Sequence, residues 1–171
     1  MCVYYVRMDC FLWAKALLLC CRHLKSVIGN IDTAMDTIAK CSGTGARDTY
    51  EIMERAADLI ARKVRILNLR IITADMLNSL SYDKRRVLDS RYIYNISAKD
   101  FSETERISMR GVYRLVNGAL AVCAEYLKER NYDNNYFESR YGNEKWIISN
   151  LRKHEAREAQ AAFSTNQFSR L

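Results

Sequence analysis

The chain contains no proline and only six glycines in 171 residues, and this scarcity restricts its fold more than any other feature. Strands joined by tight turns depend on these two residues, so their near absence argues against a β-rich fold. Good helix formers such as Ala, Leu, Arg, Lys and Glu dominate instead. We therefore predict an all-α protein, in which a long antiparallel helical hairpin is followed by a helix-turn-helix module and a C-terminal helix.

Two long amphipathic segments predict the hairpin. In the first, apolar residues at alternating spacings of four and three form a heptad seam, and in the second, apolar residues share one face, as in helices packed along a partner. A turn over 41–47 contains two glycines and is short, so the helices should pack antiparallel. The expected seams are Trp13, Leu17, Cys20, Leu24, Val27, Ile31, Ala34 and Ile38 in the first helix, and Met53, Ala56, Ile60, Val64, Leu67, Ile71 and Ala74 in the second, over 49–79.

The second helix is more apolar than one seam requires, because Leu59, Ile66, Leu69 and Ile72 lie outside it. A two-helix hairpin cannot cover so many faces, so a further packing partner is expected. That partner is either the C-terminal helix of the same chain or another copy. We favour another copy, and hence a homodimer, because helix-turn-helix proteins often bind paired half-sites.

Residues 96–120 predict the helix-turn-helix. Ser97 and Asp100 have the spacing of a capping box, and Ser108 is a good N-cap for a second helix after a turn at 104–107. A compact core would use the apolar residues Phe101, Ile107, Val112, Leu115 and Leu120.

The outward face of the second motif helix carries side chains that can bind a polar partner. It carries Met109, Arg110, Tyr113, Arg114 and Asn117, with the two arginines four residues apart and thus on one side. In the major groove, Arg can bind guanine bidentately and Asn can bind adenine. The segment predicts duplex-DNA binding through helix 108–117, although two helices that merely pack, with solvated arginines, would give the same pattern.

The sequence from Leu77 to Leu120 resembles region four of bacterial sigma factors. The resemblance rests on a helix ending in Arg-Tyr, an Ile-Ser junction, a Val-Tyr-Arg step and a closing Ala-Leu, which are Arg91-Tyr92, Ile107-Ser108, Val112-Tyr113-Arg114 and Ala119-Leu120. The layout of the whole chain is similar to that of phage late-gene regulators of the RinA and ArpU type. The resemblance implies a sigma-like transcription regulator, phage or prophage encoded, with RNA polymerase as a further partner.

Carried across by position, the resemblance places base-reading residues at Met109, Arg110 and Arg114, with Ser108 and Tyr113 near the DNA backbone. The chain departs from the family at two places. Glu105 and Arg106 stand where the family has an apolar residue and then glycine. Because arginine at positive φ costs about 1 kcal/mol, we expect a wider turn. Arg110 replaces a frequent acidic residue, which implies a target unlike a standard −35 element.

Three segments follow from these patterns: the hairpin at 1–80, for dimerisation or partner contact, the DNA-binding module at 81–130, and a linker, C-terminal helix and tail at 131–171. Asn143 is the expected cap of the last helix, and a frayed tail is expected from Ala161. Two roles are open for the last helix. Its basic residues either touch DNA phosphates, or they face water while its apolar residues dock on the hairpin, and the second alternative is favoured. The basic residues are Arg152, Lys153 and Arg157, and the apolar residues are Trp146, Ile147 and Leu151.

Cysteine and histidine usage indicates neither a metal site nor catalysis. Six cysteines without a CxxC pair and two histidines do not form the short-spaced ligand pairs of a structural zinc site. We expect reduced cytoplasmic thiols, with Cys20 in the core, and His154 on a solvated face. No catalytic motif is present, so no enzyme activity and no cofactor is expected.

Charge and hydropathy complete the predictions. The apolar run Phe11–Cys21 is interrupted by Lys15 and is shorter than the roughly 20 residues of a membrane span, so no membrane association is expected. The net charge of +7 is compatible with nucleic-acid binding. The alternative function is that of a helical oligomeric assembly or adaptor protein, or of a small-terminase-like packaging protein.

Overall fold

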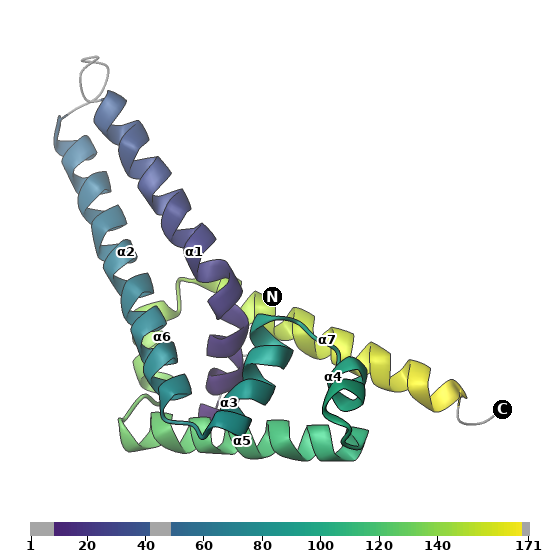
Figure 1. Cartoon of the computed structure of the whole chain (residues 1–171). Helices are drawn as coiled ribbons and strands as arrows, with labels where there is room; N and C mark the ends of the chain where they lie inside the picture. The colour runs from purple at the N-terminus through teal and green to yellow at the C-terminus, as the bar shows by residue number, and fades with distance from the viewer. Residues whose placement is uncertain (1–8, 42–48, 169–171) are drawn as a thin grey trace, which may run out of the picture.

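The computed structural model describes residues 9–41 and 49–168, with side chains described for 9–40 and 49–160. Every regular element in these ranges is helical, which confirms the predicted all-α class. Figure 1 shows a long two-helix arm, with one helix lying across its base and another extending to the side. The elements are α1 (Cys10–Cys41), α2 (Thr49–Asn78), α3 (Tyr82–Leu88), the π-helical turn η1 (Asp89–Ile93), α4 (Ala98–Glu105), α5 (Met109–Glu129), α6 (Asn134–Tyr141) and α7 (Lys145–Phe168).

The arm is the predicted antiparallel hairpin of α1 and α2 (Figure 1). The predicted seam of α1 faces inward: Trp13, Leu17, Cys20, Leu24 and Ile31 are buried, and Val27, Ala34 and Ile38 are half-buried. An ion pair between Lys63 and Asp32 also joins the two helices. Residues 42–48, which hold most of the predicted turn, lie outside the described residues.

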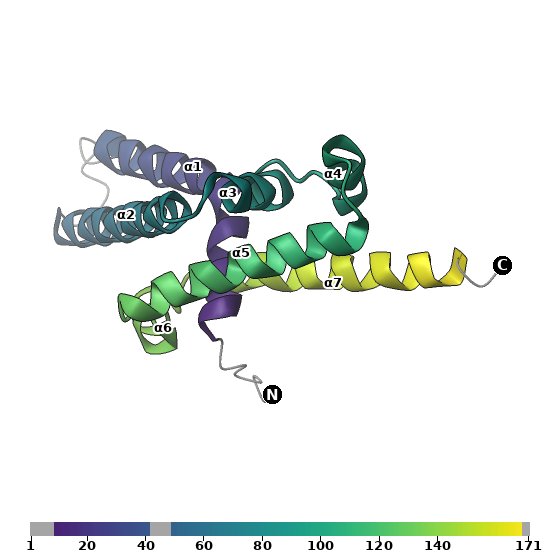
Figure 2. The ribbon, with the colours of Figure 1, turned by 60° about the horizontal axis from the view of Figure 1, so that its bottom comes forward.

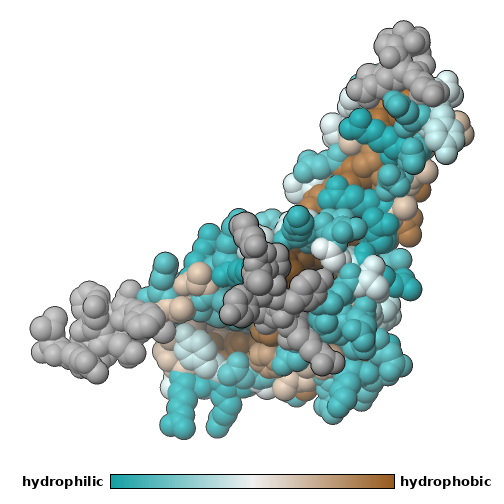
Figure 3. All heavy atoms as spheres, turned by 180° about the vertical axis from the view of Figure 1, so that it is seen from behind, coloured by the Kyte–Doolittle hydropathy of each residue, from teal (hydrophilic) through white to brown (hydrophobic). Residues whose placement is uncertain are grey.

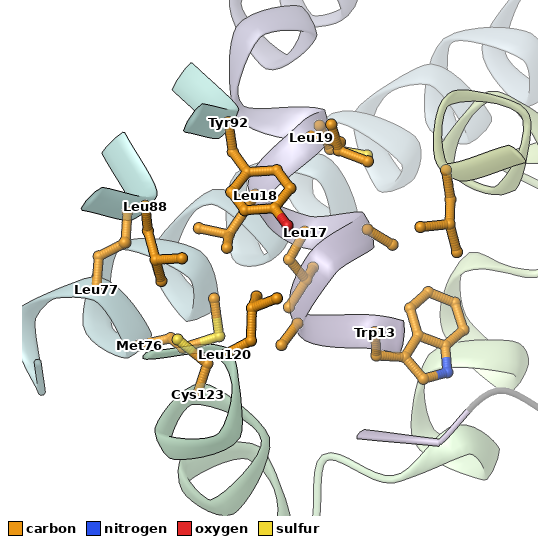
Figure 4. Packing of buried hydrophobic residues seen from close by; sticks show 14 of the residues in the cluster. Trp13, Leu17, Leu18, Leu19, Met76, Leu77, Leu88, Tyr92, Leu120 and Cys123 are labelled. Carbon is orange, nitrogen blue, oxygen red and sulfur yellow. The ribbon is translucent and has the colours of Figure 1, made fainter. Parts of the chain in front are cut away.

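The first half of α1 is the centre of the molecule. Between Trp13 and Cys20 every residue except Lys15 is at most 2% exposed, so this stretch is surrounded on all sides. Figure 2 shows it passing between the other helices, and Figure 4 shows Leu17 and Leu18 among residues from α2, α3 and α5. A helix that is apolar all round is stable only in such a buried position. The apolar run around Lys15 is therefore a core helix.

The predicted seam of α2 is wrong. Met53, Ile60, Val64 and Ile71 are 50–66% exposed, and Ala74 is also exposed. The helix instead turns its other apolar residues inward, and these are Ile66, Leu69, Ile72, Met76 and Leu77, with Leu59 half-buried. Two apolar stripes therefore run along this helix. The buried stripe is the one that continues into the end of α2 that packs against α5. The predicted seam lies largely on the surface, and only its residues Ala56 and Leu67 are half-buried.

The C-terminal region contains an element that the sequence analysis missed. Residues 134–141, expected to belong to a linker, form α6, with Asp133 as an N-cap that accepts a hydrogen bond from the Tyr136 N–H. The helix is held by Trp13, which is distant in the sequence. Its Nε1 donates to Asn134 Oδ1 at 3.1 Å, and its ring stacks on the ring of Phe137 with a centroid distance of 4.5 Å.

The last helix starts and ends later than predicted. α7 begins at Lys145, so Glu144 and not Asn143 precedes its first residue, and it continues to Phe168 where a frayed tail was expected from Ala161. Its apolar residues dock as the favoured alternative predicted. Ile147 and Leu151 are buried and Trp146 is half-buried, while Arg152, Lys153 and Arg157 are exposed.

Polar contacts fasten the start of α7 to the rest of the fold. Near its start, Glu144 is only 5% exposed and accepts from Arg62 Nε at 2.7 Å and from Trp146 Nε1 at 2.7 Å. These hydrogen bonds hold the pKa of the Glu144 carboxyl below its usual value, against the opposing effect of burial. The segments 1–80, 81–130 and 131–171 all contribute residues to one buried apolar cluster.

The described cysteines have no disulfide partners. Cys20 and Cys123 are buried, and Cys10 and Cys21 are half-buried. Burial raises the pKa of the Cys123 thiol to about 12 and that of Cys21 to about 11, which keeps both protonated at neutral pH. Cys20 is the small core residue that was predicted. Within the described residues, no helix is long and apolar enough to cross a membrane.

Candidate nucleic-acid interface

The predicted helix-turn-helix segment consists of α4, a three-residue connection and α5. Both predicted N-caps form. Ser97 Oγ accepts from the Asp100 N–H at 3.0 Å, and Ser108 Oγ accepts from the Gly111 N–H at 3.1 Å. These bonds satisfy backbone donors that would otherwise be free at the first turn of each helix. They fix where the second helix begins, and therefore which of its residues face outward.

The connection is compact, and the expected wider turn is not found. Arg106 adopts the left-handed conformation with φ of 54°, and the Ile107 N–H donates to the Ser102 carbonyl at 3.1 Å. This is the six-to-one bond of a Schellman helix end. Ser102 Oγ also donates to the Ile107 carbonyl at 2.6 Å. The local hydrogen bonds therefore hold an arginine where glycine would be less strained.

The first half of α5 has one buried and one exposed side. Val112, Val116, Ala119 and Leu120 are buried toward α1 and the neighbouring helices. Leu115, which was predicted in the core, is 38% exposed, because Val116 occupies the inward position next to Val112. The exposed side carries all six residues predicted to contact DNA, namely Ser108, Met109, Arg110, Tyr113, Arg114 and Asn117. We call these six residues the α5 face.

The α5 face is electropositive and available for binding. Between Arg106 and Ala124 the chain has no acidic residue, and three arginines recur at intervals of four. Among the described residues, neither Arg110 nor Arg114 has a salt bridge. The first turn of α5 also lacks an acidic side chain, so the positive end of the helix dipole is not neutralised there. This arrangement favours an anionic partner.

The residues around the α5 face are used to hold the module together. Arg86 of α3 pairs with Glu105 at the end of α4, which braces the two helices beside the turn. The acidic residue nearest the turn is thus already neutralised by a partner. Lys99 and Glu103 form a second, fully exposed pair on α4 at 4.0 Å, which contributes little to stability.

The Arg-Tyr pair that carries part of the sigma-factor resemblance has a packing role here. Arg91 donates to the Ile96 carbonyl at 3.0 Å and to Glu158 of α7 at 3.3 Å. Tyr92 is buried, and its ring stacks on His154 at 5.4 Å. His154 is therefore half-buried and not on a solvated face as predicted. The pair docks the C-terminal helix against the module.

Glu158 is the centre of a charge cluster joining three elements. Its carboxylate lies 2.9 Å from Lys15 Nζ of α1, 3.3 Å from Arg91 of η1 and 3.4 Å from His154 Nδ1. His154 and Lys15 together hold the pKa of Glu158 at about 2. The cluster fixes the position of α7 relative to the module.

Among the described residues, no group of three His, Cys, Asp or Glu side chains is placed to hold a metal ion. The exposed basic residues of α7 lie on a different helix from the α5 face. Comparisons with protein-family models, curated proteins and solved structures gave no match to this chain.

Proposed function

We propose that this protein is a sequence-specific duplex-DNA-binding transcription regulator that reads the major groove with the α5 face. One observation carries the proposal: two arginines and an asparagine lie together on the exposed side of α5. This helix is capped at its start and is positioned by a tight turn. Such a helix presents its N-terminal residues to base edges, as in known helix-turn-helix proteins.

Different residues of the α5 face would make different contacts with DNA. Arg110 and Arg114 supply forked donors that match the O6 and N7 acceptors of guanine, and Asn117 supplies the donor and acceptor that match adenine. Ser108 and Tyr113 have hydroxyl groups that can bond phosphate oxygens, which position a protein without reading sequence. Met109 offers an apolar contact for a thymine methyl group. The sigma-like role and a contact with RNA polymerase belong to the same proposal.

Selection of bound fragments from a random DNA pool tests this proposal. It is performed at about 150 mM salt, because the nonspecific contribution to affinity is then reduced. Wild type should enrich a motif that the Arg110→Ala/Arg114→Ala double variant loses. Each single change should cost about 1–3 kcal/mol at the selected site. Arg55→Ala, on the exposed surface of α2, is the control and should leave affinity for the motif unchanged.

A second candidate is a helical assembly or packaging protein. It is favoured by the exposed apolar stripe of α2, which is suited to contact with other subunits. Weak binding without a motif, equal in wild type and the double variant, would reject the regulator. A mass in solution of eight or more copies would then favour the packaging function.

A further inference from the structure

We propose that two copies of this chain associate in parallel through the exposed stripe of α2. We define the α2 stripe as the seven residues Met53, Ala57, Ile60, Val64, Leu67, Ile71 and Ala74. It differs from the predicted seam in containing the exposed Ala57 in place of the half-buried Ala56. All seven stripe residues are exposed except Leu67, which is half-buried. The proposal concerns a surface distinct from the α5 face, and it does not depend on DNA binding.

The spacing of the α2 stripe is that of a coiled coil. Successive members are four, three, four, three, four and three residues apart, which places Ala57, Val64 and Ile71 at a positions and Met53, Ile60, Leu67 and Ala74 at d positions. The β-branched residues Val64 and Ile71 at a positions, with Leu67 at the d position between them, match the pattern of two-stranded parallel coiled coils. At 1.5 Å per residue, the stripe extends for about 32 Å, long enough for an extended helical interface.

The stripe has no partner within the described part of the chain. α2 uses its other side to contact α1 and α5, and Met53 and Ile71 remain 66% and 57% exposed. A continuous row of apolar side chains, four of them large and exposed, marks an interaction site rather than an ordinary solvated helix face. Figure 3, which views the molecule from behind, shows hydrophobic residues along the arm.

The charges beside the stripe identify the partner as a second copy and fix its direction. In a parallel pair, each g residue lies near the following e residue of the partner helix. The g residue Arg70 then meets the e residue Asp75 of the other copy, twice by symmetry, and Lys63 meets the neutral Asn68. No like charges come together. The stripe is therefore self-complementary, as an interface on a two-fold axis requires.

An antiparallel pair would bring like charges together. Facing e residues would then be Glu54 and Asp75, and facing g residues would be Arg70 and Lys63, whose charge is partly offset by its ion pair with Asp32. Each contact would occur twice. Like charges placed opposite each other destabilise an interface. The parallel arrangement has a further structural consequence. Because α5 lies across the lower end of α2, two copies related by an axis along α2 would carry both α5 faces at the same end (Figure 1).

Sedimentation equilibrium of the full chain under reducing conditions tests the proposal. Wild type should have twice the chain mass of 19.9 kDa at micromolar concentration, and Val64→Lys/Ile71→Lys should reduce this to 19.9 kDa. Because Val64 and Ile71 are at least half exposed, the helical circular dichroism should be retained. The control Glu51→Lys/Asp58→Lys changes charges on α2 away from the stripe and should stay dimeric.

Charge exchange tests the direction without disturbing apolar packing. Arg70→Asp and Asp75→Arg should each weaken the dimer, and the double exchange should restore it, because the parallel pair regains opposite charges. Strengthening by Arg70→Asp alone would overturn the parallel arrangement in favour of the antiparallel one. A monomeric wild type, a larger oligomer, or a dimer that survives Val64→Lys/Ile71→Lys would overturn the proposal that this stripe joins two copies.

Discussion

The bidentate contact between Arg62 and Glu144 gives a prediction whose size can be worked from the structure. Arg62→Met keeps most of the side chain's apolar length but removes two hydrogen bonds to a carboxylate that is only 6% exposed. Breaking a fully buried ion pair from one side costs about 3–5 kcal/mol. Arg62 itself is 41% exposed, and Glu144 keeps its bond from Trp146, so we expect about 2–3 kcal/mol.

The pH dependence of this cost has a definite sign. In wild type the folded pKa of Glu144 lies below its unfolded value, so the contact stabilises above the unfolded pKa and is lost as pH falls through the folded one. In Arg62→Met the largest lowering influence is absent, so burial opposes only the weaker effects of Trp146 and Arg65, and the folded pKa of the carboxyl is higher than in wild type. The variant therefore gains stability relative to wild type on acidification. The difference in the free energy of unfolding between wild type and Arg62→Met is therefore largest at neutral pH and becomes smaller below pH 4.5.

Urea unfolding at one fixed chain concentration measures this difference, because association would otherwise shift the transition. Helical circular dichroism and the fluorescence of the two tryptophans report the transition. At about 2–4 °C per kcal/mol, the thermal midpoint should fall by about 4–12 °C. The double variant Arg62→Met/Glu144→Gln should be more stable than Arg62→Met, because no carboxylate is left unpaired. Arg55→Met is the surface control, and a cost for Arg62→Met no larger than for this control would refute the reasoning.

Three further outcomes are expected. Arg106→Gly should raise stability by about 0.5–1 kcal/mol in urea unfolding, because glycine adopts the φ of 54° without strain, and a loss of stability would contradict this. Leu17→Ala should cost about 2–5 kcal/mol, because the side chain is fully buried at the centre of the core, and the urea midpoint measures it. Wild type should lose its advantage over Glu158→Gln as pH falls from 4.5 towards 2, since the folded pKa of Glu158 is about 2, and acid titrations of both proteins by circular dichroism check the trend.

Features determined by nearby residues were predictable from the sequence. The caps at Ser97 and Ser108 depend on backbone groups three residues away, and both form as expected. The heptad of α1 also predicts its own buried side, because only one apolar seam runs through its second half. The six outward residues of the α5 face follow from the same local rule, since the cap at Ser108 fixes the start of the helix.

Features that depend on distant partners were not predictable in the same way. Periodicity alone cannot choose between the two apolar stripes of α2, because the choice is made by packing against α1 and α5. The polar sequence of α6 has almost no helical pattern, and the helix forms against Trp13, which lies more than a hundred residues earlier. His154 has only charged residues beside it in the sequence, and its burial depends on Tyr92 from another element.

The encirclement of the first half of α1 has a consequence for synthesis on the ribosome. The most apolar segment of this sequence is synthesised before the helices that cover it. Lys15 of that segment can pair with its carboxylate only after residue 158 has been made, 143 positions later. Nascent chains therefore carry an uncovered apolar helix for most of translation, when such surface promotes aggregation. We expect chains truncated before α7 to need a chaperone to remain in solution, whereas the completed chain can enclose the segment by itself.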